Sequence, residues 1–232
     1  MRTLGRVQRG IEALYRVETG CSVGDFVVGT EYRDELVRDL PSRVHADTLR
    51  AEHSLGLLRR PREQLLVVEQ DGEMNLALYI EPSIIANLDQ NDPSRRLGDH
   101  NLGDFLLAIE GVSHFIYTVC CARAERPVSQ LELELQAEVD KYVTCLLTTE
   151  PETGVSEQLR HRLFDAHYDA DLDDEEHDRY RAANDNAHRY ASWLEDTFVA
   201  RRRIPEMLAE LRRFYRLGLA AKLSTIATSR AA

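Results

Sequence analysis

The sequence predicts an α+β fold that is predominantly α-helical. Two strand-like runs flank an Asp-Gly pair within residues 64–81, whereas residues 101–147 carry apolar residues every three to four positions along two long stretches. Further stretches with the same helical period follow from residue 155 onward. Strands confined to one block of a chain and helices to another are typical of α+β proteins. We therefore expect a small antiparallel sheet followed by a helical bundle.

The first 56 residues predict helices and one short strand. Residues 2–18 predict an amphipathic helix that ends near Gly20. Residues 25–28 are a strand candidate, and residues 30–40 predict a helix that Pro41 closes. A fainter helical pattern follows at residues 42–56. The apolar face of the first helix consists of Leu4, Val7, Ile11, Leu14 and Tyr15.

The strongest strand signal is a β-hairpin. Residues 64–70 and 73–81 flank Asp71-Gly72, and an Asp-Gly pair between two such runs favours a tight hairpin turn. An isolated hairpin is marginally stable in water, so we expect residues 25–28 to supply a third strand. One face of the second run should be buried because its apolar residues alternate, at Met74, Leu76, Leu78 and Ile80.

Residues 101–147 predict two long antiparallel helices, which form the centre of the helical bundle. Asn101 is expected to cap the first helix, and Ser129 with Glu132 forms a Ser-x-x-Glu capping box for the second. Gly111 should permit close helix–helix approach. Each helix should cover the apolar face of the other and leave its own polar flank in solvent. The apolar positions are Leu102, Phe105, Leu106, Ile109, Val112, Ile116 and Val119 in the first helix, and Leu131, Leu135, Val139, Tyr142, Val143 and Leu146 in the second.

The remainder of the chain is expected to be helical. After a linker at residues 148–154, helices are predicted at residues 156–167, 175–201 and 204–218, and residues 219–232 form a tail. The resulting organisation is an α+β part at residues 1–92, a central helical hairpin at 101–147 and C-terminal helices at 155–228. These parts form one compact domain or two tightly packed subdomains.

Composition favours a globular cytoplasmic protein. The formal net charge of −11 opposes non-specific binding to nucleic acid or to an anionic membrane. No uninterrupted run of about 18 apolar residues is present, so we expect no transmembrane helix. Charged residues near the N-terminus interrupt any signal-peptide core. Lysine occurs only at Lys141 and Lys222, and arginine supplies the remaining positive charge.

The cysteines argue against a zinc ribbon or a thioredoxin-type centre. The chain has Cys21, Cys120, Cys121 and Cys145, and they include no Cys-x-x-Cys pair. We expect reduced thiols, because the antiparallel helices should hold Cys120 and Cys145 well apart.

Glu110, His114 and Glu138 are candidate metal ligands. Glu110 and His114 are four residues apart on one helical face, and Glu134 and Glu138 lie on the helix expected to face them. Helix bundles build carboxylate–histidine metal sites in this way, although the Glu-x-x-His spacing of di-iron proteins is absent. A bound divalent metal is therefore one hypothesis. The other places the glutamates in solvent and His114 in a half-buried, hydrogen-bonded position.

Two charged runs are compared with binding sites, the first with a calcium loop and the second with a site for an acidic partner surface. Residues 169–178 begin with the Asp-x-Asp-x-Asp of a calcium loop, but Asp174 and Tyr180 replace the required glycine and glutamate. We interpret this run as the acidic first turn of a helix. The arginines at 201–203 and 212–213 either lie in solvent at helix ends or meet an acidic partner surface.

The remaining motifs give no catalytic assignment. Arg162-x4-His167 and Arg181-x6-His188 resemble the Arg-x4–6-His motif of a helical ribonuclease superfamily, yet eight histidines and abundant arginine produce such matches by chance. No Gly-rich phosphate loop and no His-Glu-x-x-His motif occurs. We therefore expect a non-enzymatic interaction or accessory protein that self-associates through helices or binds a protein partner, without a cofactor. A metal-dependent helical hydrolase or oxidoreductase is the second hypothesis, and a helical ribonuclease is the third.

Overall fold

The computed structural model describes residues 1–39, 61–70, 72–149, 153–164 and 174–229. The chain divides into two compact units. Unit 1 consists of Met1–Gln8 and Gly20–Phe115, and unit 2 consists of Arg9–Thr19 and Ile116–Ala232. The division passes through two helices, α1 (Arg2–Tyr15) and α5 (Leu102–Arg123). The helix predicted at residues 42–56 lies outside the described residues.

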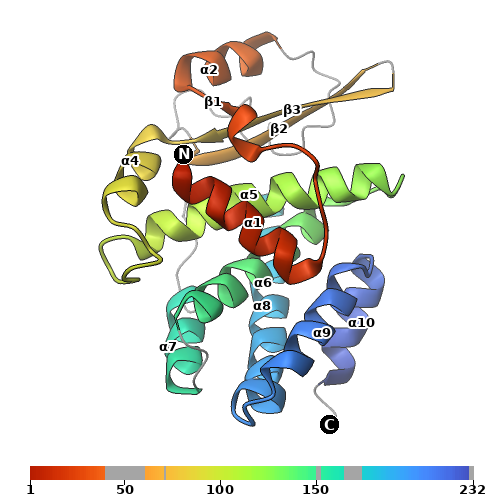
Figure 1. Cartoon of the computed structure of the whole chain (residues 1–232). Helices are drawn as coiled ribbons and strands as arrows, with labels where there is room; N and C mark the ends of the chain where they lie inside the picture. The colour runs from red at the N-terminus through yellow and green to blue at the C-terminus, as the bar shows by residue number, and fades with distance from the viewer. Residues whose placement is uncertain (40–60, 71, 150–152, 165–173, 230–232) are drawn as a thin grey trace. The chain divides into compact units, whose positions relative to one another are not determined.

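Unit 1 contains a three-stranded sheet with the strand order β1-β3-β2 (Figure 1). β2 (Glu63–Gln70) and β3 (Glu73–Ile80) pair antiparallel, which confirms the predicted hairpin. Gly72 has φ +81° in the turn, a conformation that glycine adopts without steric cost. β1 (Val27–Val28) is the predicted third strand, but it pairs parallel with β3. The sheet is therefore mixed rather than antiparallel.

The sheet is covered along the second half of β3 and the first half of β2, which pairs with it. Of the four residues expected to be buried on one face, Leu78 and Ile80 are buried, whereas Met74 and Leu76 are half-buried. A second face is covered by α2 (Thr30–Asp39). The small apolar cluster on that face consists of Leu66 and Ala77 from the sheet, with Val28, Leu36 and Val37 packed against them.

Gly111 of α5 packs closely on the sheet within unit 1. A Cβ atom at this position would lie 2.9 Å from Glu63 Oε1 and 3.1 Å from Leu78 Cδ1. Both distances are shorter than ordinary van der Waals contact. The glycine therefore permits helix–sheet approach, not the helix–helix approach expected from the sequence.

The segment between the sheet and α5 is ordered by side chains of the loop itself. α4 (Pro82–Gln90) begins with a proline whose missing N–H costs nothing at a helix start. Asn101, which is buried, donates to the carbonyls of Asn91 and Arg96, and its Oδ1 accepts from the N–H of Gly98. Its side chain thus stabilises the loop and does not serve as the predicted side-chain cap of α5.

α5 is long and apolar enough to cross a membrane, with a mean hydropathy of 1.6 over its best window. The sequence prediction of no transmembrane helix looked for an uninterrupted apolar run, and a few polar residues in α5 interrupt it. However, 72% of that window is buried inside the structure, and residues 111–119 are buried all round the helix. A helix that is apolar all round and enclosed by protein has the character of a core helix.

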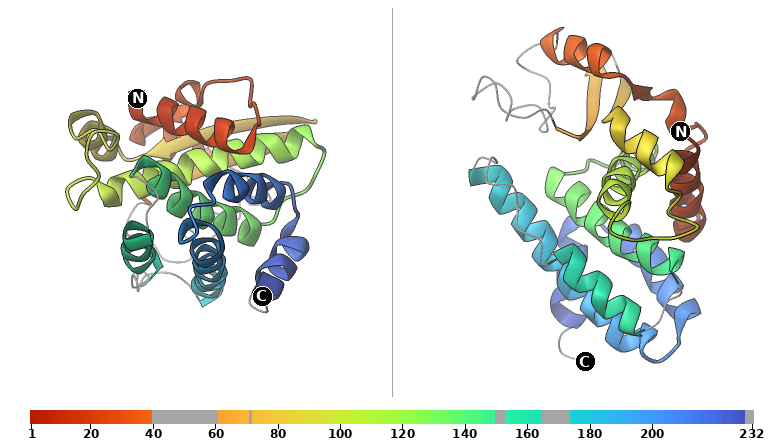
Figure 2. Two further views of the ribbon diagram at one scale, coloured as in Figure 1. Left: turned by 60° about the horizontal axis from the view of Figure 1, so that its bottom comes forward. Right: turned by 90° about the vertical axis from the view of Figure 1, so that its left-hand side faces the viewer.

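The part of unit 2 that the structure describes is helical. α6 (Gln130–Thr148) packs along α8 (Asp174–Leu194), and α7 (Thr153–Phe164) packs against both (Figure 2). A π-helical turn, Glu195–Val199, continues α8, and α9 (Ile204–Tyr215) packs on this turn. This arrangement confirms the predicted helical content after residue 155.

Two expectations for unit 2 are wrong. The last residues do not form a tail, because α10 (Leu219–Thr228) is a helix that buries Lys222 and Ile226. The polar flank of α6 is not in solvent either, since Glu132, Gln136 and Asp140 are all buried. In both places a polar side chain occupies an interior position, which apolar periodicity cannot reveal.

Candidate functional site

The three predicted metal ligands lie in different local settings. His114 is buried in unit 1, and its Nδ1 lies 3.7 Å from Oε1 of Glu63. Glu110 is half-buried in unit 1, and Glu138 in unit 2 accepts from Nζ of Lys141 at 2.5 Å. Among the residues described, no three His, Cys, Asp or Glu side chains gather as a metal site would require. The metal hypothesis stays a prediction without support from this part of the chain.

The residues of the ribonuclease-like motif have separate partners. His188 Nε2 lies 3.2 Å from a guanidinium nitrogen of Arg160, and the His188 ring stacks on Phe164 with centroids 5.2 Å apart. Arg181 is exposed and pairs with Asp178 at 3.2 Å. The second match, at residues 162–167, ends outside the described residues. His188 thus serves the packing of α7 on α8.

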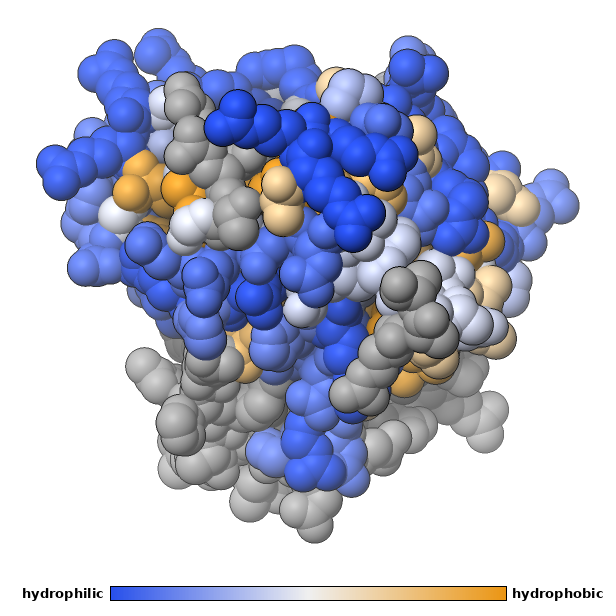
Figure 3. Space-filling view, turned by 90° about the horizontal axis from the view of Figure 1, so that it is seen from below, coloured by the Kyte–Doolittle hydropathy of each residue, from blue (hydrophilic) through white to orange (hydrophobic). Residues whose placement is uncertain are grey.

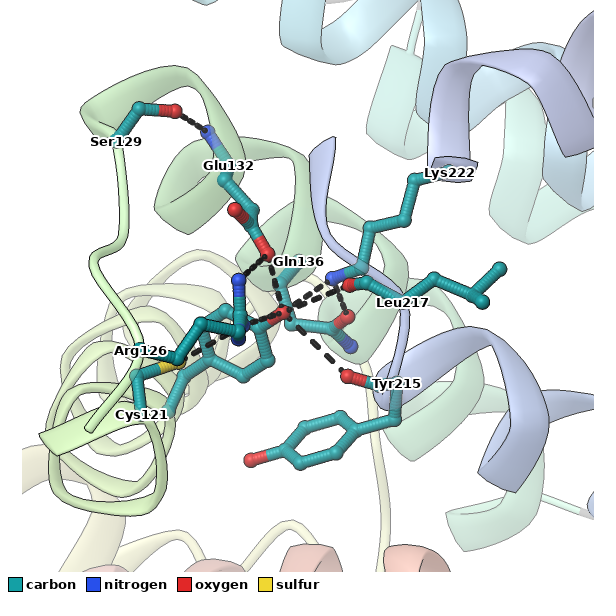
Figure 4. A network of polar contacts seen from close by, with 9 residues as sticks. Cys121, Arg126, Ser129, Glu132, Gln136, Tyr215, Leu217 and Lys222 are labelled. Carbon is teal, nitrogen blue, oxygen red and sulfur yellow. Dashed lines mark hydrogen bonds and ion pairs between the residues drawn. The ribbon is translucent and has the colours of Figure 1, made fainter. Parts of the chain in front are cut away.

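The most unusual side chain in unit 2 is Lys222, which the sequence analysis placed in a tail. Lys222 is 0% exposed on α10. It lies among polar side chains from α5, from the turn after it and from α6, as Figure 4 shows. We call this group the Lys222 cluster; it consists of Tyr117, Cys121, Arg126, Glu132, Gln136 and Lys222.

The ammonium group of Lys222 has two oxygen acceptors and two aromatic neighbours. Its Nζ donates to Oε1 of Gln136 at 2.6 Å and to the hydroxyl of Tyr117 at 2.8 Å. The same nitrogen lies 4.4 Å from the ring centroid of Tyr117 and 5.3 Å from that of Phe214. Hydrogen bonds and ring faces together replace part of the water that the amine loses on burial.

The hydroxyl of Tyr117 connects the two cations to one carboxylate. It accepts from Lys222 and, at 2.9 Å, from Arg126, and it donates to Oε1 of Glu132 at 2.6 Å. Arg126 also donates directly to that Glu132 oxygen at 2.8 Å. Glu132 therefore forms only half of the predicted capping box: its N–H donates to Ser129 Oγ at 3.3 Å, while its carboxylate turns inward.

A second carboxylate extends the network to α1. Gln136 Nε2 donates to Oδ1 of Asp140 at 2.9 Å, and the hydroxyl of Tyr15 makes a short hydrogen bond to the same oxygen. The Tyr15 ring stacks on Tyr215 with centroids 4.0 Å apart. Residues from α1, α5, α6, α9 and α10 thus meet in one polar network inside unit 2.

Burial sets the protonation of the cluster. Loss of hydration lowers the pKa of Lys222 to about 7, against the opposing attraction of Glu132 and Asp140. Burial raises the pKa of Tyr117, and its hydrogen bond to Glu132 acts in the same direction. Near neutral pH the lysine is therefore divided between its charged and neutral forms, while Tyr117 keeps its proton. A neutral amine can act as a nucleophile or a base, but this one is enclosed by protein.

A second buried network surrounds the π-helical turn of unit 2. Ser156 makes a short hydrogen bond to Glu195 and lies 2.6 Å from the hydroxyl of Tyr142. Arg160 binds both carboxylate oxygens of Glu195, from Nε at 3.2 Å and from a terminal nitrogen at 3.0 Å. Arg160 thus occupies both oxygens of Glu195, and the network joins α7 to the π-helical turn as a buried, hydrogen-bonded ion pair.

The four cysteines are free in the structure. None of the four, all of which lie in the described part of the chain, forms a disulfide. Cys145 is buried on α6, and loss of hydration raises its pKa to about 12. Cys121 accepts a hydrogen bond from Arg126 at 2.9 Å, and burial raises its pKa as well. Neither thiol has the lowered pKa of a reactive cysteine.

Comparison with known proteins identifies no relative: no family model matches the chain, and no curated protein or solved structure matches it significantly. The function has to be inferred from the side chains of this protein.

Proposed function

We propose that this chain is a non-enzymatic interaction or accessory protein of the cytoplasm that self-associates through its helices. The observation that carries the proposal is the way in which the buried ionisable groups of unit 2 bind one another. Lys222 is held by Tyr117 and Gln136, and Glu195 is held by Ser156 and Arg160. Polar networks of this kind make a core rigid and specific. Because these buried groups bind one another, they support a structural role for the interior and a function carried by the surface.

The exposed surface favours a polar, reversible contact. Among the described residues, the large hydrophobic side chains that are exposed are Met1, Tyr32 and Leu147. The face drawn in Figure 3 is mainly hydrophilic, with small separate hydrophobic patches. Obligate dimers bury broad apolar surfaces, whereas transient contacts are more polar. We therefore expect a dimer that dissociates on dilution.

Sedimentation velocity at low salt tests the proposal. The expected result is a monomer of 26.5 kDa that converts to dimer as the concentration rises from about 1 µM to about 200 µM, the range in which transient contacts associate. A single monomeric species throughout this range would contradict it.

Two further measurements separate this proposal from its alternatives. Elemental analysis that finds stoichiometric metal, lost in a His114→Ala variant, would favour the metal-dependent enzyme. Cleavage of RNA by the purified protein, lost in a His188→Ala variant, would favour the ribonuclease. The proposal expects neither result.

A further inference from the structure

Arginines gather around the C-terminal end of α1 in unit 2. Three of them donate to backbone carbonyls there: Arg212 to Leu14 at 2.8 Å, Arg216 to Tyr15 at 3.1 Å and Arg123 to Glu18 at 2.9 Å. Two more arginines line a surface hollow at the same end of α1, together with Glu12, Ala13, Val17 and Glu18. We call this group the arginine cluster; it consists of Arg9, Arg16, Arg123, Arg212 and Arg216.

Arg16 lies at an exposed position directly after the end of α1. It has φ +53°, a left-handed conformation that ends α1 directly after Tyr15. Its side chain is exposed beside the hollow.

Among the described residues that line the hollow or bind the end of α1, positive charges outnumber carboxylates. Arg123, Arg212 and Arg216 bind carbonyl oxygens, which carry no full negative charge. The C-terminus of a helix supplies only about half of one negative charge. The hollow adds two carboxylates, Glu12 and Glu18, against the five guanidinium groups of the cluster. A positive excess therefore remains, in a chain whose net charge is −11.

The like charges of the cluster act on one another. The pKa of Arg212 is lowered, first by loss of hydration and then by the positive charges of Arg16 and Arg216. Holding like charges together weakens the folded state, and perturbed groups of this kind concentrate at binding sites. A negatively charged ligand would relieve the repulsion.

We infer that the arginine cluster is the docking site for the acidic run of a second copy of this chain, an assignment that rests on the proposed self-association. That run contains Asp169, Asp171, Asp173, Asp174, Glu175, Glu176 and Asp178. The planar guanidinium group matches a carboxylate with two parallel hydrogen bonds. A two-fold dimer would make the contact twice, because each copy offers one cluster and one acidic run. Opposite charges at the contact also overcome the repulsion between two acidic chains.

Charge reversal in the hollow tests the assignment. An Arg9→Glu/Arg16→Glu variant is expected to raise the dimer dissociation constant about 10-fold or more at low salt, because a negative surface then meets the acidic run. The matched control is Arg201→Glu/Arg202→Glu, which reverses two exposed arginines of the same unit outside the cluster and also tests whether residues 201–203 meet the acidic surface instead. Arg202 has φ +56°, almost the value of Arg16. The control should change the constant less than about threefold.

A complementary variant tests both sides of the contact. Asp171→Lys/Asp173→Lys/Glu175→Lys/Glu176→Lys should also weaken the homodimer about 10-fold or more. In an equimolar mixture with the Arg9→Glu/Arg16→Glu variant, the wild-type cluster of one chain meets the wild-type acidic run of the other. The mixture should therefore dimerise more tightly than either variant alone.

A peptide of residues 167–180 provides a measurement that does not depend on the folding of any variant. It should dissociate the wild-type dimer, whereas the same peptide with Asn and Gln in place of Asp and Glu should not. Wild-type protein that stays monomeric would contradict the proposed function itself. Wild-type protein that dimerises, with the cluster variant equal to its control and the acidic peptide inactive, would overturn only the docking site.

Discussion

The sheet of unit 1 and the last helix of unit 2 are held in place by different kinds of interaction. β3 is fixed by backbone ladders to two strands and by buried aliphatic residues such as Leu78 and Ile80. α10 instead directs an amine, Lys222, into the interior, where Tyr117 and Gln136 bind it. Aliphatic contacts do not respond to pH between 7 and 9, whereas an amine with a pKa of about 7 does. A change of pH in this range should therefore alter the stability of α10 and leave that of the sheet unchanged.

The largest expected effect is the loss of the lysine itself. Lys222→Ala leaves a cavity and removes the amine that donates hydrogen bonds to Tyr117 and Gln136. The free energy of unfolding should therefore fall by about 3 kcal/mol. Urea denaturation measures the loss, and amide hydrogen exchange should place it in α10. Ser224→Ala, at an exposed position of the same helix, is the control and should change stability by less than about 0.5 kcal/mol. Equal effects of the two substitutions would show that the lysine does not hold α10.

The matching test in unit 1 is Gly111→Val. Overpacking against Glu63 and Leu78 should lower the free energy of unfolding by about 2 kcal/mol, by the same amount at pH 7 and pH 9. Gly103→Val is the control, since a Cβ atom at Gly103 meets no other atom within 4 Å. Denaturation of both variants at the two pH values checks the prediction. If the loss of unfolding free energy caused by Gly111→Val differed between the two pH values, the proposed contrast between the two units would be wrong.

The pH dependence of wild-type stability sharpens the comparison between the sheet of unit 1 and α10 of unit 2. In the folded protein the pKa of Lys222 is about 7, below the ordinary lysine value of 10.5, so the unfolded chain binds more protons between these pH values. Stability should therefore rise with pH in this window, by about 2 kcal/mol from pH 7 to pH 9. The groups facing the amine are Tyr117, Cys121, Arg126, Glu132, Gln136, Asp140 and Phe214.

Lys222→Met serves as the control for that dependence. Methionine fills the space of the lysine stem without a titrating group, so its stability profile should be flat over the same range. Urea midpoints at four or five pH values compare the two proteins. A wild-type profile as flat as that of the variant would show that the amine does not titrate in the folded state.

The smallest expected effect concerns the start of α6. Ser129→Ala removes the acceptor for the N–H of Glu132 and should cost about 1 kcal/mol, whereas Ser129→Asp should cost little. Thermal unfolding of the two variants measures the difference. An equal loss in both would assign the effect to packing rather than to the cap.

The sequence predicted the elements whose signals are local. The Asp-Gly pair specified the hairpin, Ser129 marked a helix start, and the apolar period located α5 and α6. The sequence did not indicate that the third strand runs parallel to β3, because two residues such as Val27 and Val28 carry no directional pattern. It also did not show that Gly111 faces a strand, since a small residue permits any close approach.

The candidate site was missed because polar residues occupy interior positions. Lys222 and Ile226 lie four residues apart on the buried face of α10, and a lysine there interrupts the apolar pattern. The inner flank of α6 looked solvent-exposed for the same reason, because it carries the polar residues Glu132, Gln136 and Asp140. One signal was present: lysine is rare in this arginine-rich chain. Lysine can lose its proton inside a protein and arginine cannot, so a rare lysine is a candidate for burial.

Because burial raises the pKa of the buried thiols, their rate of alkylation reports how often the surrounding helices open. The thiolate is the form of cysteine that attacks an alkylating reagent, so Cys145 should be tagged only in molecules whose α6 has opened. Cys21 in unit 1 is half-buried and should be tagged sooner. Mass spectrometry of a timed alkylation would then record how often the helical unit opens.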